Sequence, residues 1–184
     1  LNTPDDLVVD SKGNVNIADS STNCIYALDS NFKFRFKITS FVNSQGVDDA
    51  LSGCKGCIVT DKYIYDADTN KNRIVIFDLE GKYVRHLDEP EADIFEDNAI
   101  YKPIALAVDA TERLYVVSST TYQGILSLDK NGVFQAYVGA QKVAYSAWDI
   151  FWRQFQTPKQ RALSVKNVPT EYNNITIDST GFIY

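Results

Sequence analysis

One stretch of sequence occurs three times in this chain. Residues 65–78 read YDADTNKNRIVIFD, residues 16–29 read NIADSSTNCIYALD, and residues 116–129 read the looser version VVSSTTYQGILSLD. The copies recur at a period of about 50 residues, and a fixed period of that size indicates a repeated supersecondary unit. No other feature of the sequence constrains the fold as strongly.

Each copy divides into four short runs that are rich in β-branched and aromatic residues and are bounded by turn residues. The first runs of successive units are PDDLVVD from Pro4, CKGCIVT from Cys54, PIALAVD from Pro103 and YNNITID from Tyr172. Runs of this composition at short, regular spacing predict β-strands. We therefore expect each copy to form a four-stranded antiparallel sheet.

The turns between these runs carry glycine where a hairpin needs it. Gly81 and Gly132 lie in D-L-E-G-K and D-K-N-G-V, at the position where a three-residue hairpin loop takes a left-handed residue. Phe32 occupies this position in the first copy. We expect Asn31 to take the positive φ there, because asparagine tolerates the left-handed conformation.

A four-stranded sheet cannot bury both of its faces alone, and radial repetition packs each sheet against the next, which is the β-propeller architecture. A β-sandwich is the alternative, but it does not require copies to match at the level of A-D-x-x-x-N-x-I. We predict an all-β fold, a β-propeller of four-stranded antiparallel blades with a short helical insertion. The predicted parts are blade 1 (about 4–38), blade 2 (about 53–87), an acidic insertion (88–102), blade 3 (about 103–139), a helical insertion (140–171) and the start of blade 4 (172–184).

These parts make about three and a half blades, whereas propellers close with about 4 to 8. Open blade faces and a bare strand edge would be unstable in a monomer. We therefore expect either a fragment of a longer propeller, for example a six-bladed one, or a ring completed by another copy or another chain.

A particular set of residues recurs in the first two copies. They are Ala18, Asp19, Asn23, Ile25 and Asp29 in the first and Ala67, Asp68, Asn72, Ile74 and Asp78 in the second. This pattern resembles the NHL-repeat family of β-propellers and, more distantly, the gluconolactonase-like propellers. The third copy departs from it, with Ser118 in place of the Asp and no Asn-Arg-Ile. We expect the repeated Asp and Asn side chains to be structural and to hydrogen-bond backbone groups that tight hairpins leave unpaired.

The charge of the chain argues against nucleic acid as a partner. The chain has 18 Lys and Arg against 24 Asp and Glu, and DEPEADIFED at 88–97 alone holds six acids and no base. Phosphate binding needs clustered basic residues, which the sequence lacks. The acidic run is either a solvated loop or a site for a cation or partner, although it lacks the spacing of a calcium loop. No apolar run is long enough to cross a bilayer.

The mouth of the central channel is where we expect a ligand. By alignment of the innermost strands, its polar candidates are Asp5, Asp6, Lys55, Asn173 and Asn174. Carboxylate and amide oxygens that converge on one axis suit a hard cation such as calcium. The resemblance to gluconolactonase-like propellers implies a metal near this axis, with Asp6 and Asn174 as candidate ligands. The alternative is a mouth that is polar without binding a metal.

The sequence offers no catalytic constellation. The single histidine, His86, is expected in the outer strand KYVRHL, so neither a Ser-His-Asp nor a Cys-His arrangement has the residues it needs. Three cysteines and one histidine would all have to meet to bind zinc. In an extended strand Cys54 and Cys57 lie about 10 Å apart on opposite faces. This excludes a redox pair and makes Cys57 a small core residue.

The helical insertion carries an aromatic stripe. Tyr145, Trp148, Phe151, Trp152 and Phe155 recur at helical spacing. The stripe either packs on the propeller surface or docks a partner, and the docking candidates are Trp148, Phe151, Trp152 and Arg153.

Together these features favour a non-catalytic NHL-type β-propeller that recognises a protein, peptide or carbohydrate and needs no cofactor. The alternative is a metal-dependent lactonase-like hydrolase with one divalent cation, calcium or zinc, at the channel mouth. RNA recognition is disfavoured by the acidic balance. A tyrosine- and asparagine-rich sequence resembles extracytoplasmic bacterial propellers, which predicts a location at the cell surface or outside the cell.

Overall fold

The computed structural model of the protein describes residues 1–91, 100–120, 124–139, 172–178 and 180–184. Apart from one 3-10 turn, η1 (Thr69–Lys71), the regular structure in these ranges is β-strand. The prediction of an all-β fold is confirmed.

Three four-stranded antiparallel sheets make up the described core, and in each the order of strands in space follows the chain. The first contains β1 (Pro4–Val9), β2 (Val15–Asp19), β3 (Cys24–Leu28) and β4 (Phe34–Ile38). The second contains β7 (Cys54–Val59), β8 (Tyr63–Asp68), β9 (Arg73–Asp78) and β10 (Tyr83–Leu87). The third contains β11 (Pro103–Val108), β12 (Leu114–Ser118), β13 (Ile125–Leu128) and β14 (Phe134–Val138).

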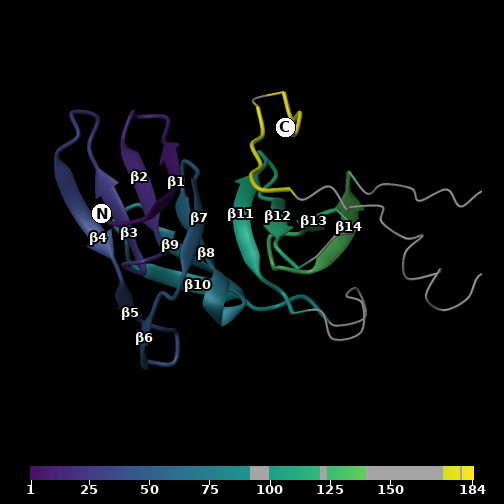
Figure 1. The fold of residues 1–184 in the computed structure, drawn as a ribbon, viewed down its shortest axis with the longest axis horizontal. Coiled ribbons are helices and arrows are strands. Elements are labelled where there is room, and N and C mark those ends of the chain that lie inside the picture. Colours follow the sequence, from purple (N-terminus) through teal and green to yellow (C-terminus); the bar gives the residue numbers. More distant parts are fainter. Residues whose placement is uncertain (92–99, 121–123, 140–171, 179) are drawn as a thin grey trace, which may run out of the picture.

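The first strands of the sheets lie together. β1 packs beside β7 and β7 beside β11, while β4 and β14 lie at the far edges of the first and third sheets (Figure 1). A small hairpin, β5 (Ser40–Val42) with β6 (Asp48–Ala50), joins the first sheet to the second. It lies at the end of the sheets where β1, β7 and β11 begin. Near the C-terminus, an Ile177–Ile183 bridge begins a further hairpin.

Alternating side chains of β9 fill two different layers of core. Val75 and Phe77 face the first sheet, in a buried cluster that contains Ala18, Ile25 and Ile38. Ile74 and Ile76 face the third sheet, in a cluster with Leu106, Val116 and Leu126. Because a strand directs successive side chains to opposite faces, one apolar run supplies both contacts.

One turn geometry recurs through the fold. The side chains of Asp10, Asp29, Asn43, Asp78, Asp109, Asp129 and Asp178 each accept the backbone N–H groups two and four residues later, at 2.8–3.1 Å. The residue three positions later has a positive φ in each case. The carboxylate of the repeated strand-end Asp is therefore already hydrogen-bonded to the backbone of its own turn.

In the first copy, the residue of this turn that has a positive φ is not the one we expected. Phe32 itself adopts the left-handed conformation, with φ 60°, and the prediction that Asn31 would do so is wrong. The carboxylate of Asp29 accepts the N–H groups of Asn31 and Lys33 and so fixes both sides of Phe32. Because the positive φ belongs to a fixed place in the turn, the more tolerant neighbour cannot take it over.

Candidate functional site at the channel mouth

Each innermost strand is irregular at the same place. The pairing register shifts between Pro4 and Asp6 in β1, between Cys54 and Cys57 in β7, and between Pro103 and Ala105 in β11. A β-bulge of this kind re-aims side chains and is common beside binding sites. The residues within the bulges are Asp5, Lys55 with Gly56, and Ile104. The bulge itself repeats, but its residues differ between the copies, and they are an acid, a base and an aliphatic side chain.

Asp6 links the first two innermost strands. Its Oδ2 accepts the backbone N–H of Cys57 at 2.9 Å, and its Oδ1 accepts the N–H of Leu7 at 2.8 Å. Asp5 is exposed and accepts the N–H of Ser20 at 3.0 Å. Asp6 therefore connects two blades, and both of its oxygens already accept hydrogen bonds.

Lys55 is exposed on a strand that packs closely against β11. Its neighbour Gly56 is buried, and a Cβ on Gly56 would lie 2.5 Å from the carbonyl oxygen of Ile104. Only glycine allows β7 to approach β11 so closely. The ammonium group of Lys55 is therefore carried by a firmly placed backbone.

The predicted asparagines lie close to the third innermost strand, since their neighbours Tyr172 and Ile175 pack in one cluster with Ile104 of β11. Asn173 and Asn174 are exposed, and Oδ1 of Asn174 accepts the N–H of Ile175, whose side chain packs on the third sheet. Within the described ranges, no hydrogen bond joins this pair to Asp5, Asp6 or Lys55. The same ranges contain no cluster of three or more His, Cys, Asp or Glu side chains placed to hold a metal ion. A metal at Asp6 and Asn174 stays a prediction.

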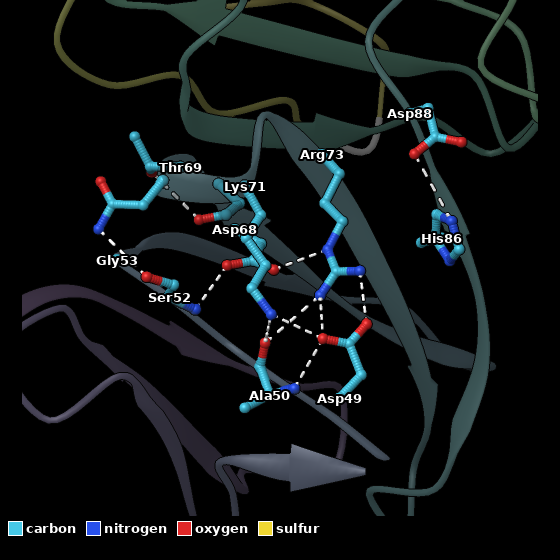
Figure 2. A network of polar contacts seen from close by, with 12 residues as sticks. Asp49, Ala50, Ser52, Gly53, Asp68, Thr69, Lys71, Arg73, His86 and Asp88 are labelled. Carbon is cyan, nitrogen blue, oxygen red and sulfur yellow. Dashed lines mark hydrogen bonds and ion pairs between the residues drawn. The ribbon is translucent and has the colours of Figure 1, made fainter. Parts of the chain in front are cut away.

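A polar network that the sequence did not reveal holds the β5–β6 hairpin against the second sheet (Figure 2). The guanidinium of Arg73 binds Asp49 of β6 with two hydrogen bonds, at 2.7 and 3.1 Å, and binds the buried carboxylate of Asp68 at 2.8 Å. Asp68 also accepts the N–H of Ser52, which leads into β7. The hydrogen bonds from Arg73 hold the pKa of Asp49 well below its usual range. This network fixes the segment that enters the innermost strand of the second sheet.

Asn23 performs the structural role that we expected for the repeated asparagines, whereas Oδ1 of Asn72 is buried and accepts no hydrogen bond from the described residues, so that the expectation fails there. Asn23 lies at positive φ, and its Oδ1 accepts the N–H of Gly53 at 2.6 Å, so that it joins the first sheet to the second. Asp19 caps the segment that enters β1, because it accepts the N–H groups of Asn2 and Thr3 at 2.5 and 3.2 Å. Asp19 and Asn23 therefore bind backbone groups, as expected.

The C-x-x-C motif is structural, although its geometry differs from our prediction. The three cysteines are free and buried, and Cys54 and Cys57 lie in the same cluster between the first and second sheets. The prediction that they face opposite sides is wrong, because the bulge in β7 inserts an extra residue and shifts the alternation. Cys57 is a core residue, as expected. Burial raises the pKa of both thiols far above their usual range, which leaves them un-ionised.

Asp66 is an unexpected carboxylic acid in this same layer. It is fully buried, and neither oxygen accepts a hydrogen bond from an N–H or O–H group of the described residues. Burial first, and then the neighbouring carboxylate of Asp68, raise the pKa of Asp66 well above its usual range, against smaller opposing effects of Cys54 and Arg73. The matching residues of the other two sheets, by strand register, are Ile17 and Val116. Asp66 therefore breaks the apolar pattern of its position.

The remaining candidates divide between two places. The helical insertion 140–171, with Trp148, Phe151, Trp152 and Arg153, lies outside the described residues, and its role stays a prediction. His86 lies in β10, where the sequence placed it, with Nδ1 2.7 Å from the hydroxyl of Tyr83. Its Nε2 lies 3.5 Å from Asp88 (Figure 2).

Solved structures with this architecture identify the fold. The chain is similar to streptogramin B lyase (14% identity, TM-score 0.56, covering 100% of this chain and 49% of that one). It is also similar to the Neurospora crassa Pan2 WD40 domain (8% identity, TM-score 0.52, 96% and 41%). The fold is that of a β-propeller. The prediction of four-stranded antiparallel propeller blades is confirmed.

A third similar structure comes from Bacteroides fragilis NCTC 9343 and is described as that of an exported protein (10% identity, TM-score 0.57, 77% and 39%). The chain spans less than half the length of each of these three structures. No family model and no curated protein matches its sequence. Among the described residues, the propeller has no helix with the length and apolarity to cross a membrane.

Proposed function

We propose that this chain is part of an NHL-type β-propeller that serves as a non-catalytic binding scaffold. Its partner is a protein, a peptide or a carbohydrate, which it recognises at the channel mouth. The observation that carries this proposal is the set of bulges in β1, β7 and β11. The bulges direct residues that differ between copies to one end of the innermost strands.

The side chains that repeat between the copies already make structural contacts within the propeller. The strand-end aspartates bind the N–H groups of their own turns, and the apolar strand residues fill the layers between sheets. Asp19 and Asn23 bind backbone as well. Function therefore belongs among the positions where the copies disagree, and the bulges place two of these, Asp5 and Lys55, exposed at one end of the innermost strands.

The chemistry of the mouth suits a neutral or mixed-charge ligand. Asp5 and Lys55 are exposed and carry opposite charges, and Ile104 is a partly exposed aliphatic neighbour on β11. A carboxylate, an ammonium and an apolar side chain can together orient a peptide backbone with its side chains, or the hydroxyl groups of a sugar. The polyanionic backbone of a nucleic acid needs a basic surface, which this mouth lacks.

The described residues also lack an activated nucleophile. The thiols of Cys54 and Cys57 are buried and un-ionised, and His86 lies on the outer strand of its sheet, away from the mouth. Chemistry by a protein nucleophile needs the nucleophile within reach of a base. Binding is the function that this arrangement supports best.

The test is a binding screen against a peptide array and a glycan array. The full-length protein is compared with the double variant Asp5→Ala/Lys55→Ala and with the matched control Asp29→Asn/Lys33→Ala, which alters an acid and a base in a turn at the other end of the first sheet. We expect the mouth variant to lose on the order of tenfold or more in affinity for a retained ligand, because it removes two charged contacts. Equal affinities of all three proteins would overturn the proposal.

A second assay separates a scaffold from an enzyme. The protein is incubated with simple lactones in calcium or zinc chloride, and ring opening is followed by proton release. The scaffold proposal predicts no turnover. Metal-dependent turnover that Asp6→Ala abolishes would replace it with a lactonase-like activity. We also propose an extracytoplasmic location, for which the likeness to an exported protein is weak support.

A further inference from the structure

Two opposite charges at the channel mouth do not neutralise each other. Asp5 and Lys55 are exposed bulge residues of β1 and β7, two strands that pack side by side. The structure shows no ion pair between them, and Lys55 makes no hydrogen bond or ion pair with any described residue. Among the same residues, the carboxylate of Asp5 accepts one hydrogen bond, from the N–H of Ser20 to Oδ2. Oδ1 of Asp5 and the ammonium group of Lys55 are therefore open to a ligand.

The opposite end of the same sheets is arranged differently. There the ammonium group of Lys62, in the turn after β7, forms an ion pair of 2.5 Å with Glu112, in the turn after β11. The hydroxyl of Ser11, in the turn after β1, donates a hydrogen bond of 2.8 Å to the carboxylate of Asp61. Neighbouring turns at that end satisfy one another across both junctions between sheets, whereas the mouth keeps an acid and a base apart.

The backbone that carries these two charges is fixed by other contacts. Beside the acid, Asp6 accepts the N–H of Cys57 at 2.9 Å and so joins β1 to β7. Beside the base, Gly56 lies against the carbonyl group of Ile104 in β11. One aspartate side chain and one hydrogen bond thus span the gap between the two charged strands. A ligand meets a negative and a positive group at a set separation.

This charge pattern distinguishes among the partners that the proposed function allows. A neutral sugar offers no charge to either group, and a uniformly acidic or basic segment is repelled by one of them. An extended peptide directs alternate side chains to one face, two steps of about 3.3 Å apart. That spacing is comparable with the gap that the Asp6 side chain and its hydrogen bond span.

We propose that the ligand of the channel mouth is an extended peptide with a basic and an acidic side chain two positions apart. Asp5 binds the ammonium or guanidinium group of this peptide, and Lys55 binds its carboxylate. The proposal rests on the proposed function, since it names the class of partner for the same site. The peptide can cross the two strands in either direction, so that both orders of the two charges fit.

A peptide array with four charge classes tests the proposal. Each class fixes three residues between randomised flanks: Lys-Ala-Glu, Lys-Ala-Lys, Glu-Ala-Glu or Gln-Ala-Gln. At low ionic strength, the full-length protein should bind the mixed class on the order of tenfold or more tightly than the other three, because only this class pairs both charges. Added salt should reduce the difference between the classes.

Reversal of one charge should switch the preferred class. Lys55→Glu gives the mouth two acids and should favour Lys-Ala-Lys, whereas Asp5→Lys gives it two bases and should favour Glu-Ala-Glu. Lys55→Glu removes no contact with the described residues, and circular dichroism checks that each variant folds. The matched controls are Glu80→Lys and Lys82→Glu, which reverse exposed charges in the β9–β10 turn at the other end of the sheet. Both should keep the preference for the mixed class.

A mixed-charge ligand and a binding mouth fail in different ways. Loss of binding in Asp5→Ala/Lys55→Ala, with no change of preferred class in Lys55→Glu, would overturn the mixed-charge ligand but leave binding at the mouth intact. A preference of the unmodified protein for the uncharged class or for a glycan would have the same meaning. Retained ligands that none of these mouth variants affects would overturn the proposed function, and the mixed-charge ligand with it.

Discussion

Replacement of Asp66 by valine should stabilise this protein, and increasingly so as the pH rises. Asp66 is fully buried in the layer between the first and second sheets, where its carboxyl oxygens accept no hydrogen bond from an N–H or O–H group of the described residues. Valine is the residue of the third sheet at the matching position, Val116, which is buried in the next layer of core. The substitution therefore removes a buried polar group and restores the apolar pattern of the repeat.

The expected gain in the free energy of unfolding of Asp66→Val has two parts. A buried carboxyl group without an N–H or O–H partner costs about 1–3 kcal/mol, less the small contribution of the weak S–H donor of Cys54, and the valine variant should recover this cost even at acid pH. The second part depends on pH, because burial raises the pKa of Asp66 in the folded state well above the unfolded value of about 3.9. The folded protein then binds more protons than the unfolded chain between these two values. The free energy of unfolding is therefore highest below the unfolded pKa. It falls by about 1.4 kcal/mol for each pH unit above that value, until the folded pKa is reached.

The assay is urea unfolding followed by circular dichroism between pH 4 and pH 8. The free energy of unfolding of Asp66→Val should exceed that of the unmodified protein by an amount that grows with pH. Asp66→Asn should remove the pH dependence without the full gain, since it keeps a buried polar group that cannot ionise. Asp48→Val, which alters an exposed carboxylate on β6, should leave the slope unchanged.

Two results would refute this account of Asp66. One is a loss of stability in Asp66→Val at neutral pH, which would mean that the carboxyl group makes a favourable interaction in the folded protein. The other is a parallel pH dependence in Asp66→Val and the unmodified protein, which would mean that Asp66 does not titrate differently in the two states.

Three further substitutions or measurements test the packing around the mouth. Gly56→Ala should destabilise the protein by about 2 kcal/mol or more, because its Cβ meets backbone; an unchanged melting temperature would show that β7 and β11 can move apart. Arg73→Ala should cost about 3–5 kcal/mol in urea unfolding, because it strands the buried carboxylate of Asp68; a loss below 1 kcal/mol, the scale of an exposed pair, would contradict that. Cys54 and Cys57 should not react with an aromatic disulfide reagent until the protein unfolds, and reaction in the native state would disprove their burial.

The sequence predicted those features that depend on local chemistry. The period of the repeat follows from comparison of the copies. The four strands of each copy and the strand-end Asp of each turn depend on residues only a few positions apart. Asp78, for example, binds the N–H groups of Glu80 and Lys82 in its own turn. Such contacts need no knowledge of the rest of the fold.

The features that the sequence did not predict depend on distant residues. Gly56 is required by the carbonyl group of Ile104, which lies on another strand. Asp49 matters because Arg73 reaches it across 24 positions of the chain. The bulge in β7 turned both cysteines into one layer, although an ideal strand would have separated them. In each case a contact with a residue distant in sequence determined the role or orientation of the side chain, and the local sequence pattern did not indicate that contact.

Hydrogen exchange with and without bound ligand tests the central claim most directly. That claim is that the repeated residues build the propeller and that the bulged ends of the innermost strands bind. With a ligand retained on the peptide or glycan array, slowed exchange should concentrate at the beginnings of β1, β7 and β11. Protection confined to the outer strands β4, β10 and β14, with none at these bulges, would contradict the account.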